Sequence, residues 1–293
     1  MTDVKTEQTS KPAGRARRLA KVMWMGLVVG VVTVVALKAS GCAGVGPKAS
    51  KEQIKQLKRT TAGETLSYLH GGDEVDPRVI YVHGTPGDGT GFADFLVTPV
   101  TGLHAISIDR PGFGQSGSVG AMVSFEEQAR AIEPLLVRRN GRWPVLVGHS
   151  LGGPIVARVA ADYPDKVAGI VIVAGSLDPE LEKIGTMQSV AQTGFVRFFL
   201  PRALDNGLTE LKDAKQQTTA LAKVLERVRC PVIIIHGTVD KLVPFENVAY
   251  MKRTLTRAVS VEVVELEGQG HFIPWQRPEE IRHAVESLRD LKQ

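Results

Sequence analysis

The stretch VLVGHSLGGPIVARVA, from Val145 to Ala160, places a serine where nucleophilic chemistry is possible. Its apolar run breaks at Gly-His-Ser-Leu-Gly and then resumes with apolar residues at helical spacing. A G-x-S-x-G pentapeptide between a β-branched strand and a helix predicts a sharp turn with Ser150 at its apex. The flanking glycines lack the Cβ atoms that would collide in such a turn. We therefore predict that Ser150 is a nucleophile.

A serine hydroxyl becomes a good nucleophile when a histidine, oriented by a carboxylate, accepts its proton. Where the serine lies on such a turn, the chain order is serine, acid, histidine. Three histidines follow Ser150. His236 ends an apolar run and His283 lies in a charged helical stretch, whereas His271 lies in EGQGHFIPW, on a glycine-flanked loop. His271 is therefore the predicted base.

Two aspartates are candidates for the orienting acid. Asp240, in IIIHGTVDKLVP, and Asp178, in VIVAGSLDP, each follow an apolar strand-like run. We favour Asp240, because Asp178 precedes a proline and also suits a turn or the hinge of an insertion.

The oxyanion of a tetrahedral intermediate needs hydrogen-bond donors, which are typically two backbone N–H groups. Leu151, directly after the predicted nucleophile, can supply one. The glycine-rich loop in VIYVHGTPGDG can supply the other, and Thr85 is the predicted donor, with His83 and Gly84 shaping the loop.

These residues lie at the ends of short apolar runs that alternate with amphipathic stretches. Such alternation predicts a mainly parallel sheet flanked by helices. The expected strands are 65–69, 78–82, 105–108, 145–147, 167–173, 232–235 and 261–265, and the expected helices are 125–139, 151–163, 246–254 and 278–291.

One interval is too long for a single connecting helix. Residues 176–229 separate two late strands and contain the apolar, aromatic stretch TGFVRFFL (193–200) and an amphipathic helix over 208–228. This composition suits a lid over a cleft. An extra surface helix without a binding role is the alternative.

The N-terminus has a different character from the rest of the chain. Residues 1–21 form a basic segment, and residues 22–41 contain sixteen consecutive uncharged residues, VMWMGLVVGVVTVVAL. The pattern predicts an uncleaved signal anchor, or a lipoprotein signal ending before Cys42. Residues 42–50 would be a flexible tether and residues 51–293 the folded domain, on the non-cytoplasmic side of the membrane, periplasmic or extracellular in a bacterium.

Charge and composition argue against several other classes of protein. The whole net charge of +5 lies within residues 1–41, which hold seven bases and two acids, so the remaining chain is neutral and no nucleic-acid partner is expected. Two cysteines cannot build a disulfide framework. No metal-binding motif occurs, and we expect neither a metal nor another cofactor.

The motifs HGTPG, DRPGFGQSG, GHSLGG, HGTVDKLVP and GQGHFIPW, in this order and spacing, resemble those of the α/β-hydrolase fold family, in particular its lidded, esterase-like members. The resemblance extends from about Arg78 to Leu291. It implies Ser150, Asp240 and His271 as the catalytic triad. It assigns no chemistry to Asp109 and Arg110.

The sequence thus predicts a membrane-tethered serine hydrolase of carboxylic esters or thioesters, acting on a hydrophobic or amphiphilic acyl substrate. A C–C bond hydrolase or an acyltransferase with the same triad, and a non-catalytic binding protein with this fold, are the alternatives. The oligomeric state stays undetermined.

Overall fold

The computed structural model describes residues 45–63, 66–117, 120–182 and 201–291. Contacts divide the chain into a unit Met1–Val45 and a unit Gly46–Gln293. The predicted basic segment, the predicted anchor and the stretch 193–200 lie outside the described residues. Within the described ranges, no helix is both long and apolar enough to cross a membrane.

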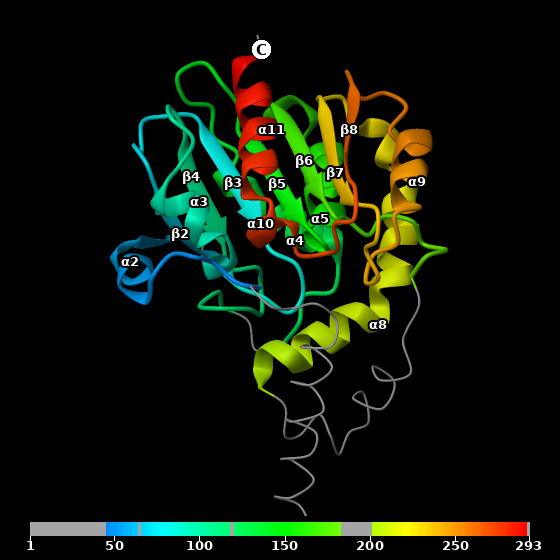
Figure 1. The fold of residues 1–293 in the computed structure, drawn as a ribbon, viewed down its shortest axis with the longest axis horizontal. Coiled ribbons are helices and arrows are strands. Elements are labelled where there is room, and N and C mark those ends of the chain that lie inside the picture. Colours follow the sequence, from blue (N-terminus) through cyan, green and yellow to red (C-terminus); the bar gives the residue numbers. More distant parts are fainter. Residues whose placement is uncertain (1–44, 64–65, 118–119, 183–200, 292–293) are drawn as a thin grey trace, which may run out of the picture. The chain divides into compact units, whose positions relative to one another are not determined.

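The described residues form an eight-stranded sheet in the order β1-β2-β4-β3-β5-β6-β7-β8 (Figure 1). Strands β1 and β2 run antiparallel to their neighbours, and all the remaining pairs are parallel. The strands are β1 (Lys58–Ala62), β2 (Leu66–Gly71), β3 (Arg78–Val82), β4 (His104–Ile108), β5 (Val145–His149), β6 (Gly169–Val173), β7 (Val232–Gly237) and β8 (Val261–Leu266).

The strands from β3 to β7 are buried along their whole length. Continuous runs rich in valine and isoleucine form them, because helices cover both faces of a parallel sheet. The outer strand β8 instead varies between half-buried and exposed residues. Apolar runs in the sequence predicted seven of the eight strands, namely all except β1.

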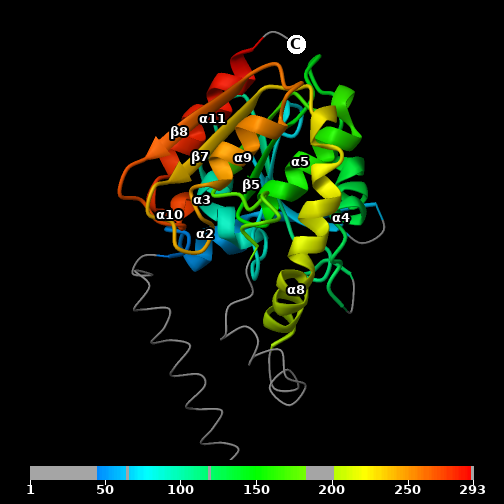
Figure 2. The same cartoon turned by 90° about the vertical axis from the view of Figure 1, so that its right-hand side faces the viewer.

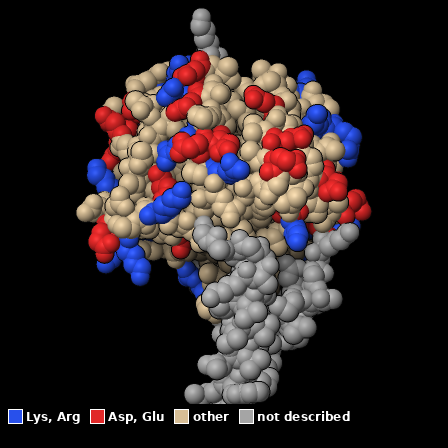
Figure 3. Space-filling model, viewed as in Figure 1, with Lys and Arg blue, Asp and Glu red and all other residues tan. Residues whose placement is uncertain are grey.

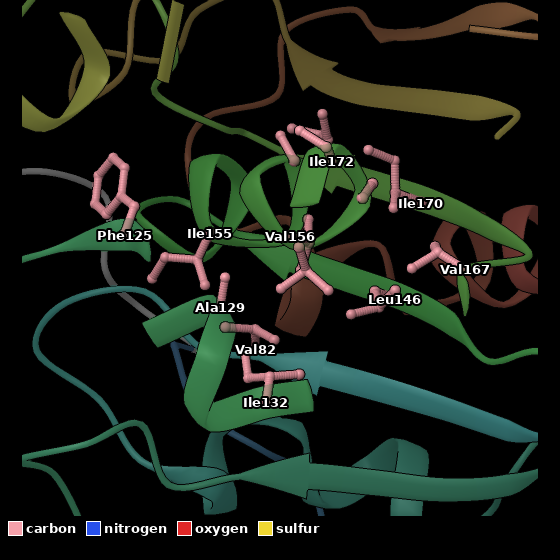
Figure 4. Close-up of a cluster of buried hydrophobic side chains, with 14 of the residues drawn as sticks. Val82, Phe125, Ala129, Ile132, Leu146, Ile155, Val156, Val167, Ile170 and Ile172 are labelled. Carbon is pink, nitrogen blue, oxygen red and sulfur yellow. The ribbon is translucent and has the colours of Figure 1, made fainter. Parts of the chain in front are cut away.

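Helices pack on both faces of the sheet (Figure 2). On one face, α4 (Phe125–Ile132), α5 (Gly152–Asp162) and α9 (Asn247–Thr254) bury apolar residues against β3, β5, β6 and β7, and Figure 4 shows the centre of this cluster. On the other face, α3 (Ala93–Val97) and α11 (Pro278–Asp290) cover the sheet, together with the short α10 (Ile273–Gln276).

The insertion contains α8 (Arg202–Ala222), which begins six residues earlier than the amphipathic pattern predicted. Its C-terminal half buries Ala214 and Leu221 in the same apolar cluster as α5. The helix is therefore attached to the core of the domain. Whether the insertion acts as a lid remains a prediction.

Two further differences from the sequence prediction have simple causes. The helix expected over 125–139 ends as α4 at Ile132 and continues as a 3-10 turn over Glu133–Leu135, because Pro134 lacks the backbone N–H of a continuing helix. Strand β1 was not predicted, since KRTTA is polar and largely exposed at the edge of the sheet. The helix α2 (Lys51–Gln56) precedes it, with Ser50 as a hydrogen-bonding N-cap.

Acidic and basic side chains are interspersed over the face of the domain seen in Figure 3. The domain also carries exposed ion pairs, such as Lys58 with Glu74 at 3.1 Å. Exposed pairs of this kind contribute little to stability.

A chain of hydrogen bonds through two buried histidines joins β1, β2 and β4. Arg139 donates to His104 Nδ1 (3.1 Å), His104 Nε2 donates to His70 Nδ1 (2.9 Å), and His70 Nε2 donates to Thr60 Oγ1 (3.1 Å). Each imidazole uses one nitrogen as donor and one as acceptor, so both must be neutral. Burial, together with the neighbouring positive charges, lowers the pKa of His104 to about 4.

Because the pKa of His104 is lower in the folded protein than in the unfolded chain, the unfolded chain binds more protons between about pH 6.5 and pH 4. The free energy of unfolding should therefore fall as the pH falls through this window, by up to about 1.4 kcal/mol per pH unit for one histidine. His104→Gln, whose amide can still donate to His70, should make this dependence less steep in urea melts. His283→Gln, on an exposed part of α11, is the control and should leave it unchanged. Equal slopes for all three proteins would contradict the assignment.

Candidate active site

Ser150 lies in the turn between β5 and α5, in a backbone conformation that few residues adopt. Its φ is +55°, its N–H donates to Val173 O (2.9 Å), and its carbonyl accepts from Gly153 N (2.9 Å). A Cβ on Gly148 would lie 2.2 Å from the carbonyl oxygen of Gly152, and a Cβ on Gly152 equally close to Val82 O. Backbone strain is thus concentrated at a half-buried serine between two positions that require glycine.

The structure brings Asp240 and His271 together from the loops after β7 and β8. His271 Nδ1 donates to Asp240 Oδ2 (2.7 Å), and Asp240 Oδ1 accepts from the backbone N–H groups of Leu242 (2.8 Å) and Val243 (2.9 Å). The carboxylate of Asp240 is fully shielded from solvent. Because Nδ1 carries the proton, Nε2 of His271 is the nitrogen that can accept one.

Two opposing effects determine the pKa of Asp240. Burial tends to raise it, but the hydrogen bond and the charge of His271, followed by the two backbone N–H groups, outweigh burial. The pKa of Asp240 is consequently held below its ordinary value. The carboxylate is therefore ionised at neutral pH, the state that can stabilise a protonated imidazole.

The glycine-rich loop after β3 lies directly against the turn at Ser150. A Cβ on Gly84 would be 2.8 Å from Ser150 Cβ and 3.2 Å from His149 O, so Thr85 follows a residue in contact with the predicted nucleophile. Leu151 directly follows Ser150, at the N-terminus of α5. One predicted oxyanion donor is thus adjacent to Ser150 in the chain, and the other follows a residue that lies against it.

Comparison with known proteins places the chain in a family. A family model described as the alpha/beta hydrolase fold matches residues 77–200, and a model of the prolyl oligopeptidase family matches residues 142–290, about half of the chain. The chain belongs to the α/β-hydrolase family. It is an α/β-hydrolase enzyme, and its fold is the one predicted from the sequence, apart from the lid, which stays a prediction.

Individual relatives of this α/β hydrolase are distant. The uncharacterized hydrolase YugF of Bacillus subtilis is 21% identical over 80% of this chain and 98% of its own length. A 2-hydroxy-6-oxononadienedioate/2-hydroxy-6-oxononatrienedioate hydrolase of a Pseudomonas species is 22% identical over 77% of this chain and 93% of its own. Among solved structures, a putative lipase from Acinetobacter baumannii matches with a TM-score of 0.63 and 19% identity, covering 83% and 98% of the two chains.

His149, the variable residue of the pentapeptide in this α/β hydrolase, supports the loop of His271. Its Nε2 donates to the carbonyl oxygen of His271 (3.0 Å), and the two ring centroids lie 4.9 Å apart. Burial lowers the pKa of His149 to about 3, so the ring stays neutral. Sequence reasoning missed this contact, which joins residues 122 positions apart.

The alternative acid, Asp178, has different neighbours. Its Oδ1 accepts from the N–H of Glu180 (2.9 Å), and its own N–H donates to Asn247 Oδ1 (2.8 Å). These contacts are those of a turn residue, which was the alternative interpretation of Asp178 from the sequence. Among the described side chains, no group of three or more histidines, cysteines, aspartates or glutamates could hold a metal ion.

The hydrogen bond between Asp240 and His271 predicts the outcome of two substitutions. Asp240→Asn should lower kcat by roughly 10⁴, because an amide can no longer hold the imidazole in the tautomer that accepts a proton at Nε2. Asp178→Asn, as the matched control, should change kcat little. Steady-state kinetics on a p-nitrophenyl ester would measure both. A large loss with Asp178→Asn and a small one with Asp240→Asn would assign the acid to the earlier loop.

Proposed function

We propose that this enzyme is a serine hydrolase that cleaves carboxylic esters or thioesters through an acyl-enzyme. The hydrogen bond between His271 and Asp240 carries the proposal, because it gives the imidazole the tautomer of a general base. Ser150 belongs to the same site, since the ring of its neighbour His149 lies against that of His271.

The proposed reaction follows from these positions. His271 Nε2 takes the proton of Ser150 Oγ as the oxygen attacks the acyl carbon, and the N–H groups of Thr85 and Leu151 stabilise the resulting oxyanion. The imidazolium then gives its proton to the leaving alcohol or thiol, and the acyl group stays on Ser150. Water, activated by His271, releases the acid by the same steps.

The proposed substrate carries a hydrophobic or amphiphilic acyl group. Val239 and Leu242, on either side of Asp240 and Lys241, are 51% and 62% exposed, so apolar side chains border the loop of the acid. Leu204, near the start of α8, is another exposed apolar residue. Similarity to a putative lipase supports the same substrate class. The insertion would act as a lid over this acyl group.

Other reactions are possible with the same triad. The C–C bond hydrolase relative supports cleavage of a carbon–carbon bond as one alternative, and acyl transfer to an alcohol is another. Peptide-bond hydrolysis is a further candidate, because the prolyl oligopeptidase model matches residues 142–290. A non-catalytic binding protein is disfavoured, since all three triad residues are present.

We also propose that residues 1–41 attach the enzyme to a membrane. The basic residues of 1–21 followed by the uncharged run 22–37 support this, as does the confinement of the net charge of +5 to this segment. The catalytic domain would then lie on the non-cytoplasmic side.

Ser150→Ala should abolish labelling by a fluorophosphonate probe and lower kcat by about 10⁶, while the far-UV circular dichroism stays unchanged. The fold should survive, because the turn depends on its glycines rather than on the hydroxyl. Ser287→Ala, on α11, is the control and should retain wild-type labelling. Near-wild-type turnover by Ser150→Ala would refute the assignment of the nucleophile.

A survey of p-nitrophenyl esters of increasing acyl length, with a thioester, a peptide arylamide and a vinylogous 1,5-diketone, should give the highest kcat/KM for an ester or thioester. Preference for the arylamide or the diketone would instead assign the peptidase or C–C hydrolase alternative.

The full chain should sediment with membranes and resist extraction by high salt, which releases proteins held by charge alone. A chain beginning at Lys51 should be soluble and active, since the proposed triad lies beyond that residue. Cys42→Ser distinguishes the two anchors, because it should block processing of a lipoprotein and leave an uncleaved anchor unchanged. A full-length protein found in the soluble fraction would contradict membrane attachment.

A further inference from the structure

A fully buried ion pair joins α8 to the carboxyl end of β4. The guanidinium of Arg110, which follows β4, donates from its two terminal nitrogens to the two carboxylate oxygens of Glu210 at 2.6 and 3.0 Å. Both side chains are at most 2% exposed. A buried charge of this kind is costly unless it is paired and hydrogen-bonded, and the two-pronged geometry meets that requirement.

Two further hydrogen bonds of the terminal nitrogens extend the contact to Gln128 and to the glycine-rich loop after β3 that contains Gly84 and Thr85 (the oxyanion loop). One terminal nitrogen also donates to Gln128 Oε1 (3.0 Å), and the other donates to the carbonyl oxygen of Gly84 (3.0 Å). Gln128 in turn donates to Glu210 Oε1 (3.1 Å). Thus Glu210 holds the guanidinium, and the guanidinium holds Gly84.

The contact with Gly84 also determines the direction of a neighbouring N–H group. The Gly84–Thr85 peptide bond is trans, so the carbonyl of Gly84 and the N–H of Thr85 point in opposite directions. His83 donates a second hydrogen bond to the same carbonyl from Nδ1 (2.7 Å), while its Nε2 accepts from the backbone of Arg110. Two donors on one carbonyl therefore orient the peptide plane and, with it, the N–H of Thr85.

Two neighbours of Glu210 on α8 contact the same region. Asn206 donates to Gly112 O (2.8 Å), and a Cβ on Gly207 would lie 3.1 Å from Thr85 Oγ1. Positions 206, 207 and 210 share one face of a helix. The N-terminal half of α8 therefore lies close to Thr85 at Gly207 and is bound to the loop after β4 at Asn206.

We propose that Arg110 and Glu210 are positioning residues for the oxyanion site, and that α8 acts on this site through Glu210. This inference rests on the proposed function, in which the N–H of Thr85 stabilises the oxyanion. Arg110 fixes the direction of that N–H. The positive charge of Arg110, which is hydrogen-bonded to Gly84 O, also polarises the Gly84–Thr85 peptide. This polarisation strengthens the N–H of Thr85 as a hydrogen-bond donor.

The test replaces the pair by apolar residues, Arg110→Met with Glu210→Leu, because such a swap leaves no unpaired buried charge and is commonly tolerated. With p-nitrophenyl butyrate, kcat should fall about tenfold while KM stays within twofold. The fall is smaller than the 10²–10³ seen when an oxyanion donor is removed, because His83 still holds Gly84 O. Inhibition by phenylboronic acid, whose serine adduct is tetrahedral and anionic, should weaken by a similar factor.

Asn206→Ala is the matched control, since Asn206 also ties α8 to a loop but does not touch Gly84. It should lower the melting temperature and leave kcat and the affinity for phenylboronic acid within twofold of wild type. Equal losses in Asn206→Ala and the double variant would mean that displacement of α8 in general is responsible, and would overturn the specific role of the pair.

Arg110→Lys gives a second measurement should the double variant fail to fold. An ammonium group keeps the charge opposite Glu210 but lacks the planar fork that reaches Glu210 and Gly84 together, so kcat should again fall at unchanged KM. Unchanged kcat in a folded variant of an active wild type would overturn this inference alone. A wild type without probe labelling or ester hydrolysis would overturn the proposed function, and this inference with it.

Discussion

The tight turn between β5 and α5 is the constraint on which the rest of the site depends. Ser150 occupies a left-handed conformation, and the backbone approaches so closely that a Cβ at Gly148 or Gly152 would lie 2.2 Å from a carbonyl oxygen. Such strain persists only where the surrounding structure holds it in place. The buried parallel sheet holds this turn in place. Ser150 N–H donates to Val173 O at the end of β6, and Gly152 lies against Val82 at the end of β3.

The same sheet explains how much of the site could be predicted from the sequence. Parallel strands bring their carboxyl ends to one edge, so the residues after apolar runs are candidates for one site. This reasoning proposed Asp240 and His271, which the structure joins by a hydrogen bond, although they lie 31 positions apart. It did not find β1, whose polar residues lie at an exposed edge and lack the apolar run that identified the other strands.

Contacts between distant polar residues escaped prediction for a different reason. His149 and His271, like Arg110 and Glu210, are far apart in sequence, and nothing in their local surroundings marks them as partners. Asp109, which was assigned no chemistry, accepts structural hydrogen bonds from the backbone of Gly89 and Gln115 as well as from Arg59. The pattern along the chain identifies residues that follow strands. Which buried polar residues are partners depends on how the helices and strands pack, and the sequence does not show this.

The two halves of α8 are attached to the domain by different kinds of contact. A detachable lid would bury an apolar stripe, which can leave a cleft and return without exposing a charge. The C-terminal half of α8 has such a stripe, with Ala214 and Leu221, but the N-terminal half buries Asn206 and Glu210. Withdrawal of that half would leave the guanidinium of Arg110 unpaired inside the protein, at the large cost of a broken buried ion pair. If the insertion acts as a lid, we therefore expect α8 to stay in place while the substrate enters.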